Sequence, residues 1–167
     1  ALGREAGGGA VQGAGGKGPG EEHLRHIQLG WHRRTPGPDA GPGLTRLRKK
    51  CIIGPLSNGN LALLLNMGKH AGLPWDTIFG SDLFGHFKPD PETYLGAAKL
   101  LCLKAEQVMM VAAHNNDLKA AQKLGLKTAF VARPTEYGPL QKYDFEAKGD
   151  WDIVAKDFGG IADKMGC

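Results

Sequence analysis

Residues 108–113, VMMVAA, form an apolar run in which apolar and polar side chains do not alternate. A strand of this kind is covered on both faces, as in the centre of a parallel sheet with helices on each side. Segments of strand and helix character alternate around it from residue 51 onward. This order predicts an α/β fold with a parallel, right-handed, doubly wound sheet. Ligands bind such sheets at the carboxyl ends of the strands.

The other elements follow from apolar spacing, turn residues and helix-start signals. Pro36, Pro38 and Pro42 are expected to break any regular element, which places Asp39 in a Pro/Gly loop. Residues 51–167 form the predicted core. Strands are predicted over 51–56, 77–80 (a weak pattern), 128–132 and 152–155, and helices over 44–50, 60–70, 90–103, 116–124 and 159–165.

Residues 1–50 differ from the core in composition. They hold 13 of the 26 glycines and carry nine Lys and Arg against four Asp and Glu. Residues 1–20 are predicted to be a disordered Gly-rich leader, because ordering glycine costs the most backbone entropy. A short polar helix is predicted over 21–29. A basic arm can contact nucleic acid, but this one has no interleaved aromatic residues and no RGG repeat, so we do not expect that partner.

Two further features bear on the setting of the protein. No apolar run approaches the ~20 residues that a membrane span needs, so no membrane association is expected. The cysteines, Cys51, Cys102 and Cys167, are odd in number and widely spaced. This pattern argues against a disulfide scaffold and a cysteine metal site, and it favours a reducing, cytoplasmic setting.

Polar side chains follow three predicted strands. Ser57 and Asn58, with the N–H groups after them, can hold an anion at a helix N-terminus, or they can simply cap that helix. Lys88, fixed between a bulky residue and a proline, can neutralise a carboxylate nucleophile and an anionic substrate, or it can be a solvated loop residue. Tyr94, six residues later, can point its hydroxyl at the same site or serve as packing.

The third strand end carries His114 and Asp117. Asp117 can orient Lys88 by ion pairing or help to activate water, or it can be an acid favoured by the helix dipole. His114 can act as a base, although an isolated loop histidine commonly has no such role.

Taken together, Ser57-Asn58-Gly59, Lys88-Pro89 and Asp117 strongly resemble the second, third and fourth motifs of the haloacid dehalogenase superfamily. Within it the sequence is similar to the type II (L-2-haloacid) dehalogenases, which also have a tyrosine at the place of Tyr94. The resemblance covers about residues 29–167. It implies an incomplete Rossmann-like haloacid dehalogenase core over 51–167, with only the end of the helical cap and a linker over 21–50.

The resemblance also implies a function, the hydrolytic dehalogenation of small 2-haloacids through an aspartyl-ester intermediate. Ser57 and Asn58 would bind the substrate carboxylate, and Lys88, Tyr94 and Asp117 would be catalytic. His114 would polarise the water. The implied partner is a small 2-haloacid or similar carboxylate, with no cofactor, and a second copy of the chain is a further candidate partner.

The sequence departs from the family pattern at two places. Ala112 and His114 stand where a serine and an asparagine are common, and Ala113 stands where phosphatase relatives have a magnesium-binding acid, so no metal site is expected. The first motif, an apolar strand followed by the nucleophilic Asp, is absent, since Asp39 is the only Asp before position 76 and no strand precedes it. We therefore expect a truncated chain that is inactive alone. A magnesium-dependent phosphatase and a non-catalytic remnant with a basic arm are the alternatives.

Overall fold

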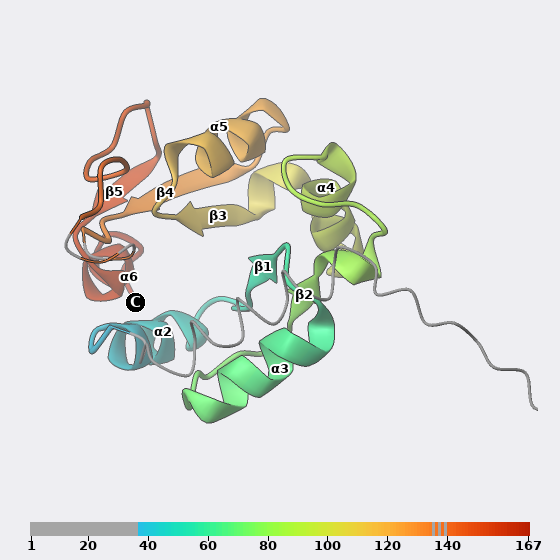
Figure 1. Ribbon diagram of the computed structural model, residues 1–167, viewed down its shortest axis with the longest axis horizontal. Helices are drawn as coiled ribbons and strands as arrows, with labels where there is room; N and C mark the ends of the chain where they lie inside the picture. The colour runs from blue at the N-terminus through green and yellow to red at the C-terminus, as the bar shows by residue number, and fades with distance from the viewer. Residues whose placement is uncertain (1–36, 135, 137, 139) are drawn as a thin grey trace, which may run out of the picture.

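The computed structural model describes residues 37–134, 136, 138 and 140–167, and Figure 1 shows their arrangement. The predicted leader over 1–20, the helix over 21–29 and the first part of the 21–50 segment lie outside the described residues. In the part of the chain that is described, no helix has the length and apolarity needed to cross a bilayer.

Helices and strands alternate along the described chain, as expected for an α/β fold. The helices are α2 (Ala40–Arg48), α3 (Leu61–His70), α4 (Pro91–Leu100), α5 (Asn115–Lys123) and α6 (Phe158–Lys164), with short 3-10 turns η1 (Ser81–Leu83) and η2 (Ala105–Gln107). The strands are β1 (Leu56–Ser57), β2 (Phe79–Gly80), β3 (Met109–Ala112), β4 (Lys127–Val131) and β5 (Ile153–Ala155).

All five strands pair in parallel, but they form two sheets instead of the single sheet that we expected. β1 pairs with β2, and β3, β4 and β5 form a separate sheet in that order. Within the described residues, β1 and β3 are each hydrogen-bonded along one edge only, and they lie nearest the middle of the molecule in Figure 1. The expected parallel order is confirmed, while the continuity of the sheet is not.

Two apolar clusters cover the two faces of the larger sheet. One packs the sheet against α2 and α6, and the other packs it against α5 and Tyr94 of α4. The first contains Ala40, Leu44, Leu47, Ala129, Val131, Ile161 and Ala162, and the second contains Tyr94, Met110, Leu118, Ala121, Leu126 and Phe130. Alternate residues of β4 therefore point to opposite clusters, which confirms a doubly wound sheet with helices on both faces.

Helix α2 begins earlier than the sequence predicted. Asp39 is its N-cap residue and Pro42 lies in its first turn. A proline is tolerated there because the first N–H groups of a helix have no partner within it. The expectation that Pro42 would break any regular element was therefore wrong, whereas Asp39 itself lies in the turn that leads into the helix.

The strand predicted over 51–56 is shorter in the structure. Ile53 and Pro55 accept hydrogen bonds from residues 76, 77 and 79, yet regular pairing starts only at Leu56. Gly54 lies so close to the carbonyl oxygen of Thr77 that a Cβ atom would overlap it. Pro55 has no N–H to donate, so a regular ladder cannot extend through it.

Candidate active site

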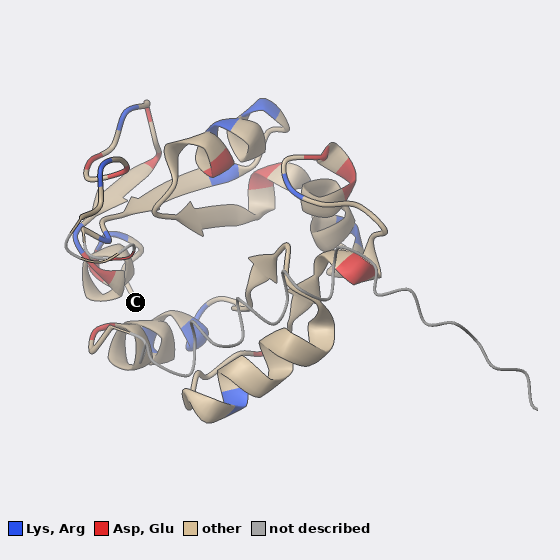
Figure 2. Ribbon diagram, viewed as in Figure 1, with Lys and Arg blue, Asp and Glu red and all other residues tan. Residues whose placement is uncertain are grey.

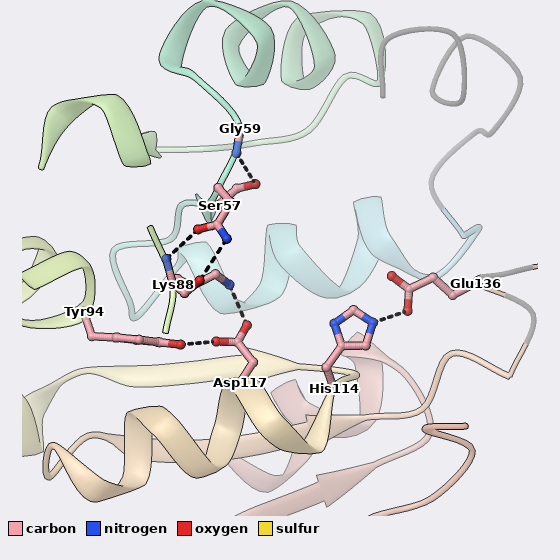
Figure 3. A network of polar contacts seen from close by, with 8 residues as sticks. Ser57, Gly59, Lys88, Tyr94, His114, Asp117 and Glu136 are labelled. Atoms are coloured by element: carbon pink, nitrogen blue, oxygen red, sulfur yellow. Dashed lines mark hydrogen bonds and ion pairs between the residues drawn. The ribbon is translucent and has the colours of Figure 1, made fainter. Parts of the chain in front are cut away.

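Four of the polar residues predicted for the site, Asn58, Lys88, Tyr94 and Asp117, form one connected network. The Asn58 carboxamide, after β1, bonds both sides of Lys88: its Oδ1 accepts from the Lys88 N–H at 2.6 Å and its Nδ2 donates to the Lys88 carbonyl at 3.1 Å. The Lys88 Nζ in turn donates to Asp117 Oδ2, on α5, at 2.5 Å. Figure 3 shows this chain of contacts, which joins the two sheets at their carboxyl ends.

Asp117 is held from two sides. Its Oδ1 accepts a hydrogen bond from the Tyr94 hydroxyl at 2.6 Å, while its Oδ2 pairs with Lys88. The Lys88 and Asp117 side chains are only 17% and 14% exposed, and Tyr94 is fully buried. Charge-assisted bonds at low exposure fix the orientation of both side chains, so Lys88 is presented as a positioned cation.

Tyr94 stands on the first turns of α4 and faces the sheet. Burial, together with the hydrogen bond and negative charge of Asp117, raises the pKa of the Tyr94 hydroxyl well above its usual value. The phenol therefore stays protonated and serves as a donor to Asp117. The sequence left open whether Tyr94 packs or points to the site, and it does both.

Ser57 lies at the turn into α3, where the backbone is tied down on several sides. The Gly59 N–H donates to Ser57 Oγ at 3.1 Å, and the buried Ser81 hydroxyl donates to the Asn58 carbonyl at 3.0 Å. Asp82 accepts from the Leu61 N–H at 3.0 Å. The Asp82 carboxylate thus already caps α3. A bound anion would therefore contact the Ser57–Asn58 turn and not the N-terminus of the helix. Ser81 and Asp82 were not predicted as part of the site, since they follow a strand of only two residues.

His114 lies at the N-cap position of α5 and turns away from the Lys88–Asp117 pair (Figure 3). Its Nε2 is 3.1 Å from Glu136 Oε2. The Glu136 carboxylate outweighs partial burial and raises the pKa of the imidazole above 6.5. Glu136 was not foreseen, because it comes from the loop after β4.

The structure offers little for a metal ion beside Asp117. Ala113, at the position where a phosphatase relative would carry an acid, is buried and has no ligand atom. Elsewhere in the described chain, His86, Asp90 and Glu92 place ligand atoms within 4.8 Å of one another, but all three are exposed. Asp90 is the N-cap residue of α4, but its side chain makes no capping hydrogen bond and faces His86 at 3.4 Å.

Asp39 is engaged at a different place in the fold. Its Oδ2 accepts from Arg133 Nη2 at 2.8 Å and from the Phe158 N–H, at the start of α6, at 3.1 Å. Burial opposes ionisation, but the Phe158 N–H and the Arg133 guanidinium outweigh it and lower the pKa of Asp39 below 3.8. Both interactions tie Asp39 to Arg133 and to the start of α6.

A cavity of about 630 Å³ lies over β4, β5 and α6, with Phe130, Val154 and Lys156 in its wall. None of the six predicted site residues lines it. The polar network at the strand ends remains the better candidate site, because its Lys88–Asp117 pair is largely buried, whereas charged residues along the cavity, such as Lys156 and Asp163, are exposed.

Comparison with known proteins points to one family. The family model described as haloacid dehalogenase-like hydrolase matches residues 4–125. The match thus begins closer to the amino terminus than the resemblance over 29–167 suggested. The (S)-2-haloacid dehalogenase of Xanthobacter autotrophicus is 32% identical over 119 residues, which make up 69% of this chain and 46% of that protein.

Solved structures agree. The crystal structure of a defluorinating L-2-haloacid dehalogenase is 52% identical, with a TM-score of 0.79 over 82% of this chain and 56% of the other. A further L-2-haloacid dehalogenase is 51% identical, with a TM-score of 0.81 over 87% of this chain and 63% of the other. The chain therefore spans about half the length of the curated relative and less than two thirds of these two structures.

Proposed function

This chain belongs to the haloacid dehalogenase-like hydrolase family, and we propose that its strand-end site serves the hydrolytic dehalogenation of small 2-haloacids. The observation that carries the proposal is the Asn58–Lys88–Asp117–Tyr94 network. It holds the largely buried ammonium group of Lys88 at the carboxyl ends of parallel strands. The two relatives that are about half identical are both L-2-haloacid dehalogenases, which supports the same substrate class.

The proposed reaction has two steps. A carboxylate oxygen attacks C2 of the haloacid, the carbon–halogen bond breaks, and the halide leaves with the bonding electrons. Water then attacks the carbonyl carbon of the resulting ester, which releases the 2-hydroxy acid and a proton and restores the carboxylate. Covalent catalysis of this kind divides one difficult displacement into two easier ones.

Lys88 supplies the positive charge. Its ammonium group would lie between the attacking carboxylate and the carboxylate of the substrate and would lower the energy of bringing two anions together. Asp117 and Tyr94 are positioning residues in this proposal, because both Asp117 oxygens already accept hydrogen bonds from Lys88 and Tyr94. The fixed geometry spares Lys88 reorganisation during the reaction.

Ser57 is the proposed ligand of the substrate carboxylate. Its Oγ accepts from the Gly59 N–H, which leaves the hydroxyl hydrogen to be donated. Both polar atoms of the Asn58 carboxamide are hydrogen-bonded to the backbone of Lys88. We therefore propose that Asn58 mainly positions Lys88, and that contact with the substrate is its secondary role. His114 pairs with Glu136 and turns away from the Lys88–Asp117 pair, so the role of polarising the hydrolytic water, which the family resemblance implies, is not assigned to it in this proposal.

The nucleophile is the missing part of this proposal. Asp39 is bound by Arg133 and Phe158, and the carboxylate that contacts Lys88 among the described residues, Asp117, is the one that orients it. We therefore propose that the 167-residue chain binds the substrate without turning it over.

The test measures substrate binding and chloride release by the purified chain with (S)-2-chloropropionate. Calorimetry should give saturable binding that Lys88→Met weakens at least tenfold, while Lys99→Met, an exposed change on α4, leaves it unchanged. Chloride release should not exceed that of buffer. Turnover would contradict the proposal that the chain lacks the nucleophile. Absence of binding, or equal binding by both variants, would contradict the proposed function.

A further inference from the structure

Ser81 is a buried serine beside the turn that carries Ser57. It directly follows β2, and because Ser57 is paired with Gly80 in the smaller sheet, the strand register brings Ser81 next to Asn58. Only 3% of Ser81 is exposed, so a substrate has almost no surface of this residue to contact. Any part that Ser81 plays in the site must therefore pass through the residues to which it is bonded.

Ser81 binds two successive carbonyl groups of the turn. Its hydroxyl donates to the Asn58 carbonyl at 3.0 Å, and its backbone N–H donates to the Gly59 carbonyl at 3.2 Å. A carbonyl oxygen can only accept, so the Ser81 hydroxyl hydrogen is committed to Asn58. Truncation of the side chain would remove the first of these bonds and leave the second in place.

The peptide group between Asn58 and Gly59 connects Ser81 to Ser57. Its carbonyl accepts from the Ser81 hydroxyl, and its N–H donates to Ser57 Oγ at 3.1 Å (Figure 3). This peptide is trans, so its carbonyl and its N–H point in opposite directions. By holding the carbonyl, Ser81 thus sets the direction from which the N–H reaches Ser57 Oγ.

We propose that Ser81 is a positioning residue for the substrate carboxylate and that it acts through this peptide group on the Ser57 hydroxyl. The inference rests on the proposed function, in which the Ser57 hydroxyl donates to that carboxylate. Three hydrogen bonds then follow one another, from Ser81 to the Asn58 carbonyl, from the Gly59 N–H to Ser57 Oγ, and from Ser57 to the substrate. Each bond in such a series polarises the next, so Ser81 makes Ser57 a better donor as well as a fixed one.

Thr93 provides the matched control. Its hydroxyl is also buried, but it has no hydrogen-bond partner among the described residues. Thr93→Val therefore removes a buried hydroxyl from α4 and leaves the three hydrogen bonds of the series intact.

The experiment titrates the full isotope-labelled chain with (S)-2-chloropropionate by NMR. We expect Ser81→Ala to raise the Kd at least fivefold in the wild-type background and less than twofold in a Ser57→Ala background, because both changes interrupt the same series of bonds. Thr93→Val should leave the Kd unchanged. Without substrate, Ser81→Ala should also shift the Asn58 carbonyl carbon and the Gly59 amide resonances, which Thr93→Val should not shift.

The outcomes separate this inference from the function on which it rests. If the wild type binds and Ser81→Ala does not weaken binding, or weakens it equally in both backgrounds, the inference is overturned and the proposed function stands. If the wild type itself does not bind, the proposed function fails and the inference fails with it. Should Ser81→Ala not fold, as judged from its amide spectrum, Ser81→Cys takes its place, since a thiol of similar size is a weak donor.

Discussion

Asp117 shows how much of the site depends on single side chains. One of its oxygens pairs with Lys88 and the other accepts from the buried Tyr94. Removing either partner leaves a poorly hydrated carboxylate oxygen with fewer donors, which costs more than an exposed hydrogen bond would. The stability of the site thus depends on the hydrogen bonds that each charged group makes. The contribution of each residue to the free energy of unfolding can be measured by substitution.

Tyr94→Phe keeps the ring and removes the hydroxyl. We expect a loss of about 1–3 kcal/mol in the free energy of unfolding, because Asp117 loses a donor in a buried place. Urea unfolding measures the loss, and the same change in an Asp117→Ala background is the control. The cost should shrink there, and an equal cost in both backgrounds would show that the hydroxyl acts independently of Asp117.

The His114–Glu136 pair predicts a pH dependence. The pKa of His114 is raised above 6.5 by Glu136, so the folded state binds the proton more tightly than the unfolded state. The stability that the pair adds is complete below pH 6.5 and is lost as the pH rises through the raised pKa. Unfolding free energies of the wild type and His114→Gln should therefore converge at higher pH. Glu136→Gln should remove the same pH dependence, and curves that stay parallel would contradict this account.

At the scale of elements, the turn between β1 and α3 depends on a close approach at Gly80. A Cβ atom there would lie 2.6 Å from the Leu61 nitrogen and would overlap Asp82 Oδ1. Asp82 caps α3 through that nitrogen. The smaller sheet, the helix cap and the Ser57 turn are therefore coupled through a residue that carries no functional group.

Gly80→Ala should cost about 1–3 kcal/mol of unfolding free energy, since the added methyl group displaces the Asp82 cap. Gly41→Ala is the matched control, because nothing lies within 4 Å of its added Cβ. In helix α2 that change should be neutral or stabilising by about 0.5–1 kcal/mol. Thermal and urea unfolding compare the two variants, and equal effects would contradict the packing argument.

The predictable elements are those with strong local signals. The apolar run at 108–113 became β3 between two covered faces, and the helix-start signal at Asp90-Pro91 was followed by α4. The division into two sheets was not predictable, because strand pairing depends on contacts far apart in sequence. Pro42 was misjudged for a local reason, since its effect depends on whether it falls in the first turn of a helix.

The same division holds for the site. The positions of Lys88, Asp117 and Tyr94 after parallel strands indicated that they would converge, and the structure brings them within hydrogen-bond distance. Ser81, Asp82 and Glu136 were missed because each acts through a partner that is distant in sequence. No pattern along the chain signals such partners.

At the scale of the whole molecule, Asp39 joins the first described helix to the last. It links α2 to Arg133, after β4, and to the first residue of α6. The two sheets are not hydrogen-bonded to each other. The Asp39 contacts and the packing of α2 on α6 therefore help to hold the described elements together. Figure 2 shows that Lys and Arg alternate with Asp and Glu along the described elements.

Asp39→Asn tests this contact. The pKa of the Asp39 carboxyl group is held below 3.8, so the carboxylate adds stability at neutral pH that is lost as the pH falls through the lowered value. We expect a cost of about 1–2 kcal/mol at pH 7 that disappears in acid, by urea unfolding. Asp163→Asn, in the exposed pair with Arg46, should change stability by only a few tenths of a kcal/mol. Equal effects of the two changes would contradict the structural role of Asp39.

The most direct measurement is an NMR titration of the isotope-labelled chain with (S)-2-chloropropionate, which maps the amides that respond. We predict saturable shifts at Ser57, Gly59 and Lys88 that Ser57→Ala reduces, with the amides around the apolar cavity at Phe130 and Val154 unchanged. Shifts confined to that cavity, or a spectrum that does not respond at all, would contradict the assignment of the haloacid site to the strand ends.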